Sequence, residues 1–389
     1  MKVTYSISAL LFTVASLCCT SFAATEYVVV NNDYVFANSA SVYKLNATTG
    51  KLTLVTVLET GGLGEPQNPA QNNFLDVEQA ISPDASCLFV LDPQSNDIAS
   101  FSKTLNYAEL GRYTNAAVNS NYNGSSLALT PNGKFLYATY SGSENLGAWT
   151  VNSDCSLTFI AAYVPSEGQG FFSSLRVSPN GAYLIVPYGN DAELFTINQN
   201  SGALTDMGFV SYTGLPGCSR FPGCDPAGID FTKDSKVVVF GNLFTYPSAM
   251  TAEITPTGLV NPRAWSLANP ERIVGALYPF LSASAYAGSG PLYFGAIGTG
   301  NEKQYAGILT ASFTEKPLSI TLTAGTVIQP PDVSDCSIAL TGDLMVIAQY
   351  YNQIAVFKTN ADGSVTPLST IIDGDAGSLF SLSLFPNTR

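Results

Sequence analysis

No histidine occurs among the 389 residues of this chain, and its absence limits the chemistry that the chain can perform. It excludes serine–histidine and cysteine–histidine nucleophilic sites and histidine-bound metals. Carboxylates remain for acid–base work, and arginines remain for binding anions. Only five arginines precede the C-terminal residue. We single out Arg176 and Arg272 as candidate anion binders, although an ion pair with one of the many acids is the simpler alternative for each.

Acidic side chains gather in segments that lead into short apolar runs. These acids are Glu65, Asp76, Glu78, Glu167, Asp225, Glu271, Asp332, Asp335, Asp373 and Asp375. Oxygen ligands of this kind can hold calcium, and Asp373-Gly-Asp375 has part of the spacing of a calcium loop without its downstream bidentate Glu. Calcium binding at Asp373 and Asp375 is one hypothesis, and solvated acids are the simpler one. No other cofactor is expected, because the chain has no P-loop and no dinucleotide-binding glycine fingerprint.

The overall charge limits the kind of partner. Sixteen Lys and Arg residues stand against 29 Asp and Glu residues, which gives a net charge of −13. An acidic surface repels phosphate backbones and anionic lipids, so we expect no binding to nucleic acid or to membranes.

Residues 1–23 have the pattern of a secretory signal peptide. Lys2 precedes an apolar run of 13 residues, 5–17, and Ser21-Phe22-Ala23 supplies a small-residue cleavage site before Ala24. Such a run falls short of the roughly 20 residues that span a bilayer. We therefore predict a soluble protein, secreted to the extracellular space or the periplasm, with residues 24–389 as a single domain.

Export to an oxidising compartment favours disulfides among the five cysteines that follow the signal peptide. Cys218 and Cys224 bracket the short loop CSRFPGC, and we expect them to pair. A thiolate metal site, the alternative, would need two further ligands nearby. Cys87 with Cys155 is the second bridge that we predict, and the odd count leaves one thiol unpaired.

A repeat of turns and strands organises the whole chain. Alternating runs of Val, Ile, Leu, Phe and Tyr are separated by Ser/Thr-Pro-Asn/Asp-Gly turns, which is typical of β-hairpins. The turn positions are Pro83, Pro131, Pro179, Lys233, Gly288, Gly342 and Pro386, spaced by 48, 48, 54, 55, 54 and 44 residues. Seven such units without a helical period predict an all-β fold, a seven-bladed β-propeller of four-stranded antiparallel blades. An ordinary β-sandwich array is the alternative.

The two ends of the chain are complementary. The segment SLFSLSLF at 378–385 matches the innermost strand of a unit, and TEYVVVNND at 25–33 matches the second strand. We therefore expect the C-terminal strand to join the N-terminal blade, which closes the ring and removes its free edge.

The turn and strand motifs resemble those of a known family. Turns such as SPNG followed by strands such as YLIVPY, and later turns such as NSGALT, resemble the lactonase-type propellers. That family includes 6-phosphogluconolactonases and carboxymuconate-lactonising cyclases. The resemblance spans nearly all of the chain after the signal peptide, and it implies the propeller fold together with chemistry that opens or closes a lactone.

The positions at which the family carries its catalytic residues differ in this chain. The family's histidine, six residues before a Ser-Pro turn, is replaced by Ser173, and an arginine that follows in the next loop is replaced by Ala192. The family's Asn-Glu-Leu segment becomes Gly241-Asn242-Leu243. In the preceding blade, Ser125 occupies the position equivalent to Ser173.

These observations lead to two competing functions. We expect a monomeric module that binds a small ligand or an extracellular protein at the mouth of the ring, through Ser173, Ser125 and Arg272. The rival is a lactone hydrolase or lactonising cyclase acting on a sugar or aromatic lactone, with Asp191 or Asp225 as the replacement carboxylate and Arg176 as the anion anchor. A scaffold without a small-molecule site is a third option, because propellers serve many functions.

Overall fold

The computed structural model describes the greater part of the chain from Glu26 to Phe385. The described residues are 26–34, 36–64, 79–114, 124–140, 145–165, 174–216, 218, 224–243, 247–268, 277–296, 307–327, 336–349, 353–373 and 382–385.

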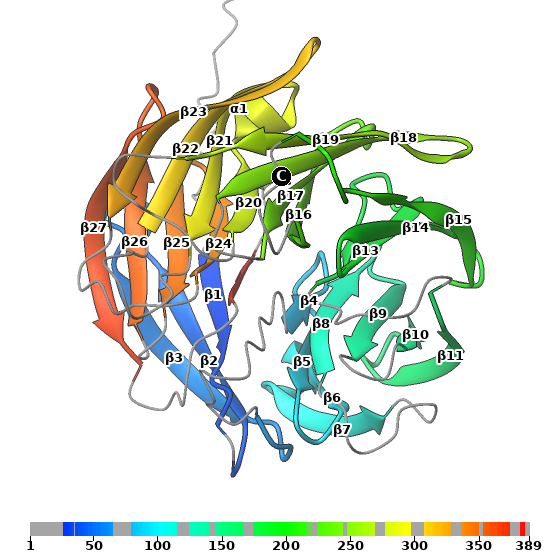
Figure 1. Cartoon of the computed structure of the whole chain (residues 1–389). Helices are drawn as coiled ribbons and strands as arrows, with labels where there is room; N and C mark the ends of the chain where they lie inside the picture. The colour runs from blue at the N-terminus through cyan, green and yellow to red at the C-terminus, as the bar shows by residue number, and fades with distance from the viewer. Residues whose placement is uncertain are drawn as a thin grey trace, which may run out of the picture.

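Within these residues the chain forms seven four-stranded antiparallel sheets, which are the blades of a propeller (Figure 1). The fold predicted from the repeat is therefore confirmed. From the innermost strand outward, blade 1 consists of β28 (Leu382–Phe385), β1 (Glu26–Asn31), β2 (Ser39–Leu45) and β3 (Leu52–Glu59). Blade 2 consists of β4 (Gln79–Ile81), β5 (Cys87–Asp92), β6 (Asp97–Ser102) and β7 (Ala108–Thr114). Blade 3 consists of β8 (Gly124–Leu129), β9 (Phe135–Tyr140), β10 (Asn145–Val151) and β11 (Leu157–Tyr163).

The remaining blades follow in chain order. Blade 4 consists of β12 (Arg176–Val177), β13 (Tyr183–Tyr188), β14 (Asp191–Ile197) and β15 (Leu204–Ser211). Blade 5 consists of β16 (Pro226–Phe231), β17 (Val237–Asn242), β18 (Ser248–Thr255) and β19 (Gly258–Ser266). Blade 6 consists of β20 (Leu277–Leu281), β21 (Ser289–Ala296), β22 (Gly307–Glu315) and β23 (Leu318–Val327). Blade 7 consists of β24 (Cys336–Thr341), β25 (Leu344–Gln349), β26 (Gln353–Thr359) and β27 (Val365–Ile372).

Helical structure in the described residues is limited to two short elements. The 3-10 helix η1 (Lys103–Leu105) lies between β6 and β7, and α1 (Ala283–Tyr286) lies between β20 and β21. No helix in the described segments is long and apolar enough to cross a membrane.

The repeated turns join the first and second strands of the blades. Their fourth position adopts a left-handed backbone, which glycine tolerates without a steric cost. Gly133 and Gly181 hold this position, and Ala85 and Ser235 hold it where glycine is replaced, all with φ between +57° and +71°. In three of these turns the first residue's hydroxyl donates to the Asn or Asp two residues later over 2.7 Å: Ser82 to Asp84, Thr130 to Asn132 and Ser178 to Asn180. The same local chemistry therefore produces the same turn in successive blades.

The closure of the ring is also as predicted. Strand β28 pairs antiparallel with β1, with Leu384 opposite Val28 and Leu382 opposite Val30. The N-terminal segment therefore supplies the second strand of blade 1, and the C-terminal segment supplies its innermost strand. Figure 1 shows the blue blade 1 between the orange blade 7 and the cyan blade 2.

The core lies between the blades. All six residues of β5, β9 and β17 are buried, whereas every residue of the outer strand β7 is exposed or half-buried. In each blade the pairing of the third strand with the outer strand shifts register once. Such β-bulges bend and twist a strand, which suits blades that are narrow at the axis and wide at the rim.

Both predicted disulfides are present. Cys87 at the start of β5 bonds Cys155 in the β10–β11 turn, and this bridge joins blade 2 to blade 3. Cys218 bonds Cys224 between β15 and β16, where the chain passes from blade 4 to blade 5. Disulfides persist in oxidising compartments, so both bridges are consistent with an extracellular or periplasmic protein.

Candidate functional site

The two predicted catalytic carboxylates lie at the same end of the ring. Because the strands of a blade alternate in direction, the links between second and third strands meet the links between blades at one mouth. Asp191 begins β14 directly after the link from β13, opposite Tyr188. Asp225 ends the link from blade 4 to blade 5, immediately before β16. The structure therefore brings together two residues that are 34 positions apart (225 − 191).

Asp225 is held in place from both sides. The residue before it, Cys224, is fully buried and bonded to Cys218. The backbone N–H of Asp225 donates to Oδ1 of Asn242 over 2.9 Å, and its carbonyl accepts from the N–H of Leu243 over 2.8 Å. Asn242 lies in the segment where the resemblance implies a glutamate, and here it positions the backbone of Asp225. Sequence reasoning missed this role, because no local pattern links Asn242 to Asp225.

The environment of Asp225 makes it a proton-exchanging group. Burial, followed by the nearby charge of Asp191, raises the pKa of Asp225 to about 7. A carboxyl with a pKa of about 7 is present in both protonation states near neutral pH. Such a group can donate a hydrogen bond in one state and accept a proton in the other, which is the behaviour expected of an acid or base at a functional site.

Arg176, predicted as the anion anchor, has other partners. It lies in β12, the innermost strand of blade 4, and its guanidinium donates to the carbonyl of Ile229 in β16. The same group lies 3.6 Å from a carboxylate oxygen of Asp230. Asp230 also accepts from the N–H of Leu281 in blade 6 over 2.7 Å. Arg176 therefore takes part in a network that ties blades 4, 5 and 6 together, which is the simpler alternative that the sequence left open.

The other predicted site residues are only partly described. Ser173, Arg272 and Asp375 lie outside the described residues, and Ser125 belongs to β8 but its side chain is not described. Asp373 follows β27 and is buried. In the described segments no group of three or more His, Cys, Asp or Glu side chains could hold a metal ion. Calcium binding at Asp373 and Asp375 stays a hypothesis.

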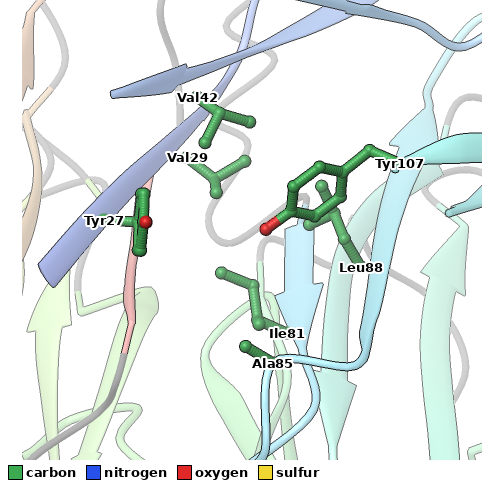
Figure 2. Close-up of a pocket in the computed structure, with 7 residues that line it drawn as sticks. All are labelled: Tyr27, Val29, Val42, Ile81, Ala85, Leu88 and Tyr107. Atoms are coloured by element: carbon green, nitrogen blue, oxygen red, sulfur yellow. The ribbon is translucent and has the colours of Figure 1, made fainter. Parts of the chain in front are cut away.

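A small apolar cavity lies between blades 1 and 2, at the end of the strands away from the mouth (Figure 2). It encloses about 20 Å³ and is lined by Tyr27, Val29, Val42, Ile81, Ala85, Leu88 and Tyr107. Figure 2 shows the phenol groups of Tyr27 and Tyr107 on opposite sides of this space. Burial, and then the neighbouring Tyr27, raises the pKa of Tyr107. A volume of this size holds about one water molecule, so the cavity is not a site for a substrate.

Comparison with known proteins agrees with this architecture. A family model described as "Lactonase, 7-bladed beta-propeller" matches residues 78–221. A comparison with curated proteins gave no match.

Solved structures of similar fold include bacterial lactonase-type propellers. The periplasmic gluconolactonase of Pseudomonas aeruginosa is 16% identical, with 92% of this chain and 99% of that chain covered and a TM-score of 0.67. A proposed 6-phosphogluconolactonase from Bacteroides fragilis is 17% identical, with 94% and 99% covered and a TM-score of 0.66. A protein from Lactobacillus plantarum is 11% identical, with 93% and 99% covered and a TM-score of 0.68. Identities this low show the fold alone. Together with the family model, they confirm the predicted resemblance to lactonase-type seven-bladed propellers.

Proposed function

We propose that the mouth between blades 4 and 5 binds a small hydroxylated molecule through Asp191 and Asp225, in a protein exported to an oxidising compartment. The observation that carries this proposal is that Asp225 lies near Asp191 at the mouth and that burial, together with the charge of Asp191, raises the pKa of Asp225 to about 7. A protonated Asp225 donates a hydrogen bond while Asp191 accepts one, so the pair matches a hydroxyl group, which does both.

Lactone hydrolysis is the second candidate function, and the same pKa favours it. A general base is most effective when its pKa lies near the working pH, and Asp225 meets this condition. An ester-opening site also needs donors that stabilise the oxyanion. Arg176 is committed to Asp230 and Ile229, so those donors would have to come from other groups at the mouth.

One experiment separates the two functions. The purified chain without residues 1–23 is titrated calorimetrically with a panel of sugar and aromatic lactones and assayed for their hydrolysis, with and without calcium. The variants are Asp191→Asn and Asp225→Asn. The matched control is Asp154→Asn, which changes an exposed acid in the β10–β11 turn.

Binding that is weakened about tenfold or more by both mouth variants, and unchanged by the control, supports the binding role. Turnover that rises through an apparent pKa of about 7 and is lost in Asp225→Asn supports hydrolysis. Binding and turnover that neither mouth variant alters would contradict both functions at this site. Calcium-dependent binding spared by both variants would instead direct attention to the loop of Asp373 and Asp375.

A further inference from the structure

A second group of buried carboxyls lies away from the proposed ligand site, where blade 1 meets blade 2. Asn31 ends β1, and Asn38 and Thr60 flank β2 and β3 on the blade 1 side. Asp92 and Asp97 end β5 and begin β6 on the blade 2 side. All five residues are at most 4% exposed. We call these five residues the seam network.

Hydrogen bonds of the seam network cross from one blade to the other. Asn38 Nδ2 donates to Asp92 Oδ1 over 2.8 Å, and Thr60 Oγ1 lies 2.5 Å from the same oxygen. Asn31 Nδ2 donates to the carbonyl of Leu91 over 3.0 Å, and Asn38 Nδ2 also donates to Asn31 Oδ1 over 2.9 Å. One carboxylate oxygen of Asp92 in blade 2 therefore accepts hydrogen bonds from two side chains of blade 1, the blade that closes the ring.

The other oxygen of Asp92 needs a proton. Asp92 and Asp97 face each other in the β5–β6 pairing. Asp97 is ion-paired with Arg112 of β7, so Asp97 is the member of the pair that carries the charge. Oδ2 of Asp92 is buried and has no donor among the described residues. Burial, followed by the hydrogen bond with Asp97, raises the pKa of Asp92 well above its ordinary value. A proton on this oxygen, donated to Asp97, satisfies both carboxyls.

Close packing leaves little room for another arrangement. A Cβ atom added at Gly62 would collide with the Asp92 carboxyl, so the backbone of blade 1 covers this group directly.

Other titratable groups surround Asp92 and Asp97. Arg112 pairs with Asp97, Asp33 accepts from Asn31 over 3.4 Å, and Tyr140 of blade 3 is close enough to feel the charge of Asp97.

We propose that the proton shared by Asp92 and Asp97 acts as a pH-sensitive lock between blades 1 and 2, and that its loss as the pH rises loosens the β1–β2 loop of blade 1, which lies at the mouth. Two adjacent carboxylates in a buried site repel each other, and among the described residues the one ion pair at this site, from Arg112, goes to Asp97 rather than to Asp92. Separation of the two blades relieves this repulsion by admitting water.

The segment that would be released includes exposed aromatic residues. Asn38 connects the β1–β2 loop to the network, and its backbone N–H donates to Gly62 while its carbonyl accepts from Thr60. The same loop carries Tyr34 and Phe36, which are 47% and 81% exposed with their ring centroids 6.2 Å apart. The lock therefore controls how the mouth presents its most exposed aromatic side chain among the described residues.

The sign of the pH dependence follows from the raised pKa. The folded state holds the Asp92 proton more tightly than the unfolded chain does. The stability that Asp92 contributes is therefore fully present below the ordinary carboxyl pKa and is lost as the pH rises through the folded-state value.

Asp92→Asn keeps an acceptor for Asn38 and Thr60 and supplies a permanent donor toward Asp97. Thermal unfolding of both proteins between pH 5 and pH 9 tests the proposal. The melting temperature of the wild type should fall relative to that of the variant, by about 3 °C or more over this range.

The control variant is Asp362→Asn, which removes an exposed turn carboxyl whose pKa is lowered by hydrogen bonds from Ser364. Its melting temperature should differ from that of the wild type by a constant amount over the same range. A constant difference for Asp92→Asn as well would overturn the proposal.

Hydrogen–deuterium exchange provides an independent measurement on the wild type, so the test remains decisive even if Asp92→Asn does not fold. After correction for intrinsic rates, amides in residues 36–64 should exchange about tenfold faster at pH 9 than at pH 6, while those of blade 5 should not. Equal corrected rates in residues 36–64 at the two pH values would count against the lock.

Discussion

Asp225 and Asp92 are both carboxyls with raised pKa values, but their surroundings give them different roles. Asp225 is half-buried at the mouth, so its proton can exchange with a bound molecule. Asp92 is fully buried and hydrogen-bonded to two side chains of the neighbouring blade. Access to solvent, rather than the size of the pKa shift, separates a candidate ligand-binding group from a structural one.

The contribution of Asp191 to the acidity of Asp225 can be measured. Asp191→Asn removes a nearby negative charge, so the pKa of Asp225 should fall below about 7. It should stay above the ordinary value for aspartate, because burial is the larger cause of the shift. Carbon-13 NMR titration of the aspartate carboxyls measures this change. Asp206→Asn, on the outer strand of the same blade, is the control. An unchanged titration of Asp225 in Asp191→Asn would show that the two groups do not interact.

Asp225 should also affect stability with a defined sign. Its folded-state pKa exceeds the unfolded value, so its contribution falls as the pH rises from about 4 through about 7. Asp225→Asn should therefore gain stability relative to the wild type over this interval, by about 1–3 kcal/mol in denaturant-induced unfolding. If the difference in unfolding free energy between Asp225→Asn and the wild type stays constant between pH 4 and pH 8, then Asp225 has the same pKa in the folded and unfolded states.

At the residue scale, the sequence predicts what local spacing determines. The pairing of Cys218 with Cys224 follows from a short loop bracketed by two cysteines, and it is present. The partner of Arg176 could not be predicted, because Asp230 lies in the next blade, 54 residues away (230 − 176). The burial of Asp92 was missed for the same reason, since its donors Asn38 and Thr60 belong to another blade.

At the scale of strands and turns, the repeat was predictable because each turn depends on its own residues. A left-handed position and a hydroxyl-to-Asx hydrogen bond are both determined within five residues. The register shift between the third and outer strands had no sequence signal that we recognised, although every blade contains it. Such shifts depend on how the whole blade twists, and not on a single residue type.

The two disulfides should contribute differently to stability and to binding. A bridge across 68 residues restricts the unfolded chain more than one across six, so loss of Cys87–Cys155 should cost about 4 kcal/mol and loss of Cys218–Cys224 about 2 kcal/mol. The short bridge holds the residue next to Asp225, so only its loss should also weaken ligand binding at the mouth. Paired Cys→Ser variants, compared by chemical unfolding and calorimetric titration, measure both effects. If the two double variants lose ligand binding equally, the loss results from lower overall stability and not from a local effect of the Cys218–Cys224 bridge on Asp225.

At the scale of the whole molecule, the ring depends on a strand contributed by the opposite end of the chain. Without β28, the backbone groups of β1 that now face it would have no partner, and Val28 and Val30 would lose the innermost strand of their own blade. These valines are fully buried and belong to one hydrophobic cluster with Leu344 and Val346 of blade 7, so the loss would extend across the junction of blades 1 and 7. An unpaired strand edge is also a template for association with another chain.

Deletion of residues 382–389 therefore tests closure, and deletion of residues 386–389 is the matched control because it leaves β28 intact. The longer deletion should lower the melting temperature by roughly 5–10 °C and produce dimers or larger species in light scattering. The shorter deletion should leave a monomer with the stability of the full chain. If both truncated proteins unfold at the same temperature and remain monomeric, β28 is dispensable and the ring is held by contacts between the remaining strands. The stability of the propeller is expected to depend on closure, because a single strand joins the two ends of the chain and converts a row of blades into a ring.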